Sequence, residues 1–280
     1  MQFYFDRPLY VLRLIQILLS LILMLQTLEI FALRSEFSKN GGFAWKIFRG
    51  DFFIFPKFIR SFFDFVYQPQ IFDVVLAARL VVCALTLLPS TLGLLPALAM
   101  AQLLLSLVIL WRCRGAFNGG SDFMSLILQM SLGVSMLFYH NPTVAKGALW
   151  YIAVQVCLSY VMAGVVKIKR ADWMSGRALE GFLKTSIYLQ PSWVTSFWTQ
   201  SYHFKSATWG FLLFEVLFPV SLWMGPKWCV LFLLVGALFH LANFFIFGLN
   251  RFFWIWIAAY PAVYFCSLSL SQSAIAASNP

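Results

Sequence analysis

The chain has 280 residues, of which 61% are hydrophobic and 11% are charged, and its mean hydropathy is +0.83. This composition excludes an ordinary soluble globular domain, in which about 25% of the residues are charged. The net charge of +10 would suggest nucleic-acid binding in a soluble protein. Here the cations lie between apolar runs, where they contact lipid headgroups and set topology, so we expect a membrane protein that binds lipid and no nucleic acid.

Apolar runs recur along the whole sequence, and each is close to the roughly 20 residues that a helix needs to cross the hydrocarbon core. The first run lacks the cleavage pattern of a signal peptide, so we interpret it as a span. We predict about eight spans, at residues 10–33, 71–89, 91–111, 122–139, 148–168, 207–225, 228–248 and 252–270. The expected fold is therefore all-α, a polytopic transmembrane helical bundle.

Two stretches do not follow the spanning pattern. Residues 45–68 interleave phenylalanine with lysine, arginine and aspartate, so one helix face is aromatic and the other is charged. Residues 169–206 are also amphipathic and are interrupted at Pro191. Both stretches are typical of interfacial helices that lie on the membrane and cap a cavity between spans. We expect residues 1–280 to form one integral-membrane domain with no extramembrane domain.

Basic residues are distributed unevenly among the predicted loops. Most of the lysines and arginines lie in residues 34–70, 112–121, 167–206 and 249–251. The positive-inside rule places these loops in the cytoplasm. One missed or additional span would reverse part of this pattern, so both orientations stay open.

The cysteines give no sign of a disulfide framework or a metal site. Cys83, Cys113, Cys157, Cys229 and Cys266 are scattered, without a CxxC pair and without paired spacing to histidine. We interpret them as small buried apolar residues.

Ionisable side chains inside a membrane are costly, so each one is a candidate functional residue. Lys167 is the first of interest, because Tyr160, Ala163 and Gly164 share its helix face and small residues there let another backbone approach closely. If the amine is packed inside, desolvation disfavours its charged form, and a neutral amine is a competent base. The alternative is an interfacial anchor next to the basic residues that follow.

Glu215 and His240 also fall within predicted spans. Glu215 lies in "GFLLFEVLFPV" with no cation within a turn, so its partner must come from another helix, and Lys167 or His240 are the candidates. Gly236, His240 and Asn243 form a polar stripe on one helix face. A lysine, a histidine and a glutamate that converge in a Phe-lined chamber would suit proton abstraction from a hydrophobic substrate.

Three blocks around these residues carry a resemblance to a known family. They are "YVMAGVVKIKRADWMSG" (160–176), "FEVLFPVSLW" (214–223) and "LFHLANFFIFGLNRFFWIWIAAYP" (238–261). In these blocks the chain resembles the HTTM family, the membrane domain of vitamin K-dependent gamma-glutamyl carboxylase and its bacterial relatives. The likeness extends over roughly residues 120–265.

The resemblance implies roles for several residues. Lys167 stands at the second position of the family's lysine pair, where the base that deprotonates vitamin K hydroquinone is expected, and Val166 stands at the first. His240 matches the histidine of the family's Phe-His pair. The expected catalytic residues are therefore Lys167, His240 and Glu215. Trp173, Asn243 and Tyr160 are expected to bind the cofactor, a vitamin K-type hydroquinone such as menaquinol.

Two functions follow from this resemblance. The first is a quinol-dependent enzyme with carboxylase- or epoxidase-like chemistry that modifies or matures a peptide or lipid in the bacterial cytoplasmic membrane. Short HTTM proteins also resemble the membrane component that matures the sporulation-delaying peptide toxin, which implies a small peptide substrate or a partner membrane subunit. The second is a non-catalytic membrane factor for maturation, export or immunity of a secreted peptide.

Overall fold

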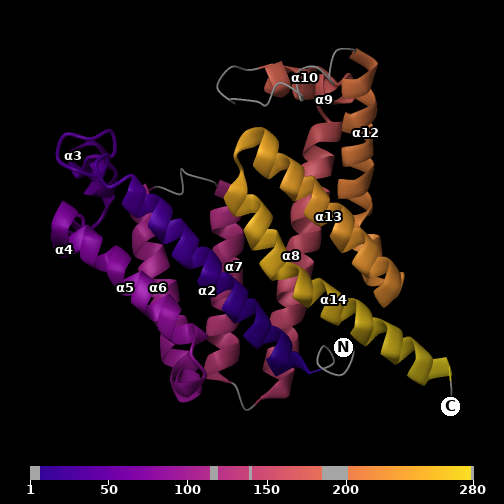
Figure 1. Ribbon diagram of the computed structural model, residues 1–280, viewed down its shortest axis with the longest axis horizontal. Coiled ribbons are helices and arrows are strands. Elements are labelled where there is room, and N and C mark those ends of the chain that lie inside the picture. Colours follow the sequence, from indigo (N-terminus) through magenta and orange to yellow (C-terminus); the bar gives the residue numbers. More distant parts are fainter. Residues whose placement is uncertain (1–6, 114–118, 139–140, 185–200, 279–280) are drawn as a thin grey trace. The chain divides into compact units, whose positions relative to one another are not determined.

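The computed structural model describes residues 7–113, 119–138, 141–184 and 201–278, and all regular structure in this part of the chain is helical (Figure 1). The predicted all-α fold is confirmed. The chain forms two compact units. One comprises Met1–Leu12 with Asn141–Pro280, and the other comprises Arg13–His140.

Six described helices are long and apolar enough to cross a membrane. They are α2 (Pro8–Ala32), α5 (Pro69–Leu87), α6 (Leu95–Cys113), α8 (Pro142–Ile168), α13 (Pro226–Phe247) and α14 (Asn250–Ser278). The two other predicted spans are also helices, α7 (Gly119–Leu137) and α12 (Ser201–Leu217). The predicted number of eight was approximate, because α12 has 17 residues and α7 begins with the polar sequence "GGSD".

Buried polar side chains link the helices of the Arg13–His140 unit. Gln102 of α6 donates hydrogen bonds to the hydroxyl of Ser20 in α2 at 2.9 Å and to that of Thr86 in α5 at 3.1 Å. Arg13 donates to the carbonyl of Thr86 at 2.7 Å. Lipid chains offer no hydrogen-bond partners, so these paired groups help to hold the three helices together.

The first amphipathic stretch forms α3 (Trp45–Phe48), the 3-10 helix η1 (Arg49–Ile54) and α4 (Lys57–Val66). On the inner face, the Phe52 ring lies 5.0 Å from Trp45 and 4.9 Å from Phe63 between centroids. On the outer face, Ile54 is 84% exposed and Phe58 is 73% exposed. Helix α4 places its apolar and its charged residues on different faces, as predicted for residues 45–68. The exposed apolar side chains of the segment form a surface suited to the membrane interface.

Asp64 joins the helices of this segment through Arg49 and Trp45. Arg49 donates two hydrogen bonds to the carboxylate, at 2.7 and 2.8 Å, and the Trp45 indole donates a third at 2.9 Å. The Arg49 guanidinium lowers the pKa of the Asp64 carboxyl below its ordinary value, and the Trp45 hydrogen bond adds to this effect.

We expect Asp64→Asn to lower the melting temperature by about 1–2 °C at neutral pH, since partly exposed ion pairs contribute little. A carboxyl with a lowered folded pKa stabilises the protein above its unfolded pKa of about 3.9, and this contribution is lost as the pH falls through the folded pKa. The difference between wild type and variant should therefore vanish below about pH 3. Thermal unfolding in detergent across this pH range measures it, and a difference that persists in acid would contradict the assignment.

In the unit that contains Asn141–Pro280, α12 and α14 both pack on α8, and α13 packs on α14. The short helices α9 (Ala171–Met174) and α10 (Arg177–Lys184) follow α8 and contact α12 (Figure 1). They belong to the second predicted amphipathic stretch. Of the rest of that stretch, residues 185–200 lie outside the described residues, and residues 201–206 begin α12. The 3-10 helix η3 (Phe218–Leu222) continues from α12.

Gly164 lets α8 and α12 approach closely. A Cβ atom at this position would lie 2.8 Å from Cγ2 of Val216 and 3.2 Å from Cβ of Glu215. A larger residue would separate the two helices. The small-residue face predicted beside Lys167 therefore packs against the turn of α12 that carries Glu215.

Candidate functional site

Lys167 and Glu215 form an ion pair between α8 and α12. The Lys167 amine, in the last turn of α8, donates a hydrogen bond to Oε1 of Glu215. The Glu215 side chain is 3% exposed and that of Lys167 is 23% exposed. The partner of Glu215, left open between Lys167 and His240 by the sequence, is therefore Lys167.

The ion pair has an aromatic neighbour, and one of its oxygen atoms lacks a hydrogen-bond partner. The Lys167 amine lies 5.3 Å from the centroid of the Trp173 ring, within the range of a cation–π interaction. Among the described residues, the second carboxylate oxygen of Glu215, Oε2, has no hydrogen-bond partner although it is buried. A buried acceptor of this kind ordinarily takes a hydrogen bond from a neighbouring group or from an ordered water.

His240 belongs to a second polar group. The Tyr160 hydroxyl lies 2.8 Å from Nε2 of His240 and 2.7 Å from the hydroxyl of Tyr260, so Tyr160 links α8 to both α13 and α14. Gly236, one turn before His240, makes room for this group, because a Cβ there would lie 3.0 Å from the Tyr160 hydroxyl and would clash with Tyr260. The three predicted catalytic residues thus fall into two hydrogen-bonded groups, Lys167 with Glu215 and His240 with the tyrosines.

Tyr260 and Trp256 are members of the second group that the sequence did not indicate. Trp256 packs against His240 with ring centroids 5.0 Å apart, and its indole nitrogen has no partner among the described residues. The two residues are four apart in "WIWIAAYP", so helical spacing places them on one face of α14. Spacing within α14 could not show that this face meets α13.

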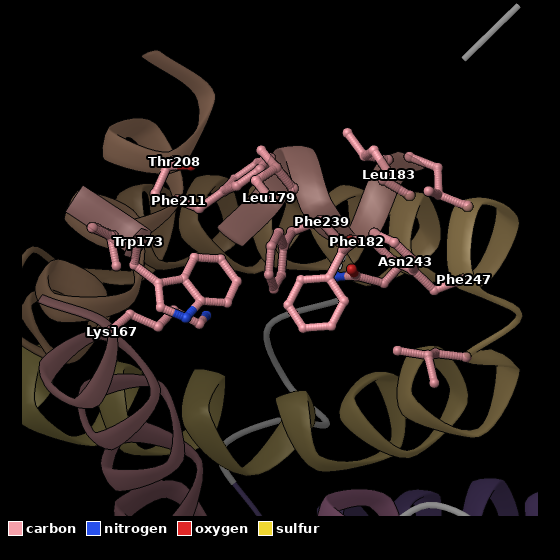
Figure 2. Close-up of a pocket in the computed structure, with 14 residues that line it drawn as sticks. Lys167, Trp173, Leu179, Phe182, Leu183, Thr208, Phe211, Phe239, Asn243 and Phe247 are labelled. Carbon is pink, nitrogen blue, oxygen red and sulfur yellow. Dashed lines mark hydrogen bonds between the residues drawn. The ribbon is translucent and has the colours of Figure 1, made fainter. Parts of the chain in front are cut away.

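A cavity of about 270 Å³ lies beside the Lys167–Glu215 pair. It is lined by side chains from α8, α9, α10, α12 and α13, most of them phenylalanine, leucine and isoleucine. Figure 2 shows Lys167 next to Trp173 on one side of the cavity, and Asn243 near Phe247 on the other. Trp173 and Asn243, both predicted to bind the cofactor, line this cavity. Tyr160, the third such residue, is 3% exposed and is not among the lining side chains.

These features define an integral membrane protein in which Lys167, hydrogen-bonded to a buried glutamate, lines an apolar, aromatic cavity. The HTTM domain matches residues 130–269, which is half of the chain and includes α8, α12 and α13 completely. The chain therefore belongs to the HTTM domain family, as the sequence blocks predicted. The comparisons with curated proteins and with solved structures gave no match.

Proposed function

We propose that this HTTM-family membrane protein binds a vitamin K-type hydroquinone, such as menaquinol, in the aromatic cavity and uses the Lys167–Glu215 pair as the base. One observation carries the proposal. The cavity is apolar along most of its lining, and the Lys167 amine that lines it is hydrogen-bonded to a buried carboxylate. A site with these properties suits a flat, apolar ligand that presents one proton donor.

The residues present fit such a ligand. Trp173, Phe182, Phe211 and Phe239 line the cavity with aromatic rings, which pack well against another ring. The Lys167 amine lines the cavity and is the polar group that a phenolic hydroxyl would meet there. The amide of Asn243 supplies a further polar group on the other side of the cavity.

The proposed base is the hydrogen-bonded pair and not the amine alone. Lys167 and Glu215 share one hydrogen bond, so a proton can pass between the amine and the carboxylate. We infer that the Lys167 amine, which lines the cavity, passes a proton to the Glu215 carboxylate and takes one from the hydroxyl of the ligand. The carboxyl is then protonated, and the Lys167 ammonium stabilises the negative charge that remains on the ligand. A bound hydroquinone supplies the acidic hydroxyl and, with oxygen, the oxidative energy for base-driven chemistry on an acceptor.

We propose that the acceptor is a small peptide or a lipid and that the protein acts in the bacterial cytoplasmic membrane. The resemblance to the carboxylase and to membrane proteins that mature a peptide toxin supports this part of the proposal. A partner membrane subunit would then deliver the acceptor to the site.

A second candidate function is a non-catalytic membrane factor for a secreted peptide, and the same ion pair favours it. A salt bridge between α8 and α12, next to the close contact at Gly164, is also what two spanning helices need in order to stay together. In that case Lys167 would be structural, and the cavity would bind part of the peptide or a lipid chain.

Oxygen-dependent conversion of vitamin K hydroquinone to its epoxide by the purified protein in detergent separates the two functions. We expect activity in the wild type and a loss of at least about 100-fold in Lys167→Met. Lys169→Met is the matched control, because Lys169 is an exposed lysine just beyond α8, and it should keep full activity. An inactive but folded wild type would favour the non-catalytic factor, and an active Lys167→Met would show that the pair is not the base.

A further inference from the structure

Helices α12 and α13 lie close in the sequence but pack on different helices, α12 on α8 and α13 on α14. Phenylalanine rings fill the space between them. Phe211 and Phe239 have ring centroids 5.3 Å apart, and Phe214 lies 6.3 Å from both Phe239 and Phe232. We call these residues, Phe211, Phe214, Phe232 and Phe239, the Phe seam.

The Phe seam borders the cavity and lies next to apolar side chains that face outward. Phe211 and Phe239 line the cavity, and all members of the seam are partly exposed. The outward-facing leucines next to them are Leu213 and Leu217 on α12 and Leu234 and Leu238 on α13, and all are exposed. An exposed, purely apolar surface on a spanning helix contacts the hydrocarbon chains of the lipid. At this place the cavity is therefore bordered by phenylalanine side chains whose neighbours on both helices face outward.

Aromatic side chains are well suited to a barrier that opens. A ring contact of this type contributes about 0.5–1.5 kcal/mol beyond simple burial, and a phenylalanine ring moves by rotation about two side-chain bonds. Turning Phe214 or Phe239 outward breaks no backbone hydrogen bond. A ring that turns outward enters the lipid, which is as apolar as the helix surface. The movement therefore exposes no apolar surface to water.

We propose that the Phe seam is a lateral entrance through which ligands dissolved in the lipid reach the cavity. The site then selects membrane-dissolved amphiphiles, with a flat apolar body and one polar head, over water-soluble compounds. The head would be held by Lys167 and the body by the phenylalanines that line the cavity. The choice of ligand rests on the proposed function, whereas the route rests on the packing of α12 and α13.

Photolabelling from the lipid phase tests the route. The double variant Phe214→Cys/Phe232→Cys is reconstituted in lipid nanodiscs. Its two new cysteines are then joined by a short, reducible bis-methanethiosulfonate linker. The native cysteines are buried. A membrane-partitioned aryl diazirine is then activated, and mass spectrometry measures its incorporation at Leu179 and Leu212, which line the cavity and are 8% and 1% exposed.

We expect the linker to reduce this incorporation at least tenfold and reduction of the linker to restore it. Phe214→Cys alone, treated with the same reagent, controls for added bulk. In proteins without a linker, Phe239→Ala should raise the rate of incorporation several-fold, and Leu238→Ala on the lipid-facing side should leave it unchanged. Equal labelling of linked and reduced protein, or equal labelling by a water-soluble diazirine, would overturn the lateral entrance.

Binding of a naphthohydroquinone, measured in the same nanodiscs, distinguishes this inference from the proposed function. If naphthohydroquinone binds but the cavity is not labelled from the lipid phase, the lateral entrance is contradicted and the proposed function is not. If labelling depends on the Phe seam but naphthohydroquinone does not bind, the proposed ligand is wrong. The entrance would then admit another amphiphile.

Discussion

Lys167→Met is expected to lower the free energy of unfolding by about 3–5 kcal/mol, because it leaves the Glu215 carboxylate buried without its cation. The carboxylate is 3% exposed and cannot reach water without displacing part of α12 or α8. Unfolding in mixed detergent micelles, followed by circular dichroism, measures the change. A variant as stable as the wild type would show that the two charges do not depend on each other in the folded protein.

Glu215→Gln should cost less, about 1–2 kcal/mol, which is typical of a weakened buried hydrogen bond. The Lys167 side chain is 23% exposed at the end of α8, so its amine can turn toward the lipid headgroups when the carboxylate is gone. The two single substitutions should therefore lower the free energy of unfolding by different amounts. Equal decreases would indicate that Lys167 and Glu215 are equally buried.

The double variant Lys167→Met/Glu215→Leu separates stability from chemistry. An ion pair replaced by apolar residues of similar size is often neutral or stabilising, so this protein should recover most of the stability lost in Lys167→Met. Hydroquinone epoxidation should stay absent. Activity in the double variant would contradict the proposed role of the pair, and continued instability would show that the apolar residues do not fill the site.

Gly176→Ala should destabilise the protein by about 2–4 kcal/mol. Gly176 has φ of +83°, in the left-handed region that favours glycine. A Cβ atom there would also lie 2.6 Å from the backbone nitrogen of Lys205 and 2.9 Å from its Cα atom. The strain would push α9 and α10 away from α12, and with them the cavity residues Leu179 and Phe182.

Gly181→Ala is the matched control, since Gly181 lies in the middle of α10 and an added Cβ would meet no atom within 4 Å. Alanine is the better helix former by about 1 kcal/mol, so this variant should be as stable as the wild type or more so. The pair is compared by melting temperature and by naphthohydroquinone affinity, both of which should fall only in Gly176→Ala. Similar behaviour of the two variants would show that the contact with Lys205 is unimportant.

Much of the fold was predictable because its causes are local. A run of apolar residues about 20 long predicts a spanning helix whatever surrounds it, and each predicted span corresponds to a helix. The alternation of phenylalanine with charges in residues 45–68 likewise predicted α3 and α4. The number of spans was less certain, because α7 and α12 lie near the limits of length and polarity.

The candidate site shows where local patterns end. Helical spacing placed Gly164 beside Lys167 and Gly236 beside His240, and both glycines lie at close helix contacts. The same spacing could not decide whether Lys167 or His240 is the partner of Glu215. It could not show whether Lys167, Glu215 and His240 converge. In the structure Lys167 pairs with Glu215, and His240 shares a hydrogen bond with Tyr160, which also bonds to Tyr260.

The sequence by itself therefore determined that this is an all-helical membrane protein of the HTTM family, and which faces of α8 and α13 carry small and polar residues. Only the tertiary structure decided that α12 lies against Gly164, so that Glu215 meets Lys167, and that the Phe seam lies between α12 and α13. The physical reason is that periodicity fixes the direction of a side chain relative to its own helix axis. Which helix then occupies that direction depends on how all the helices pack together.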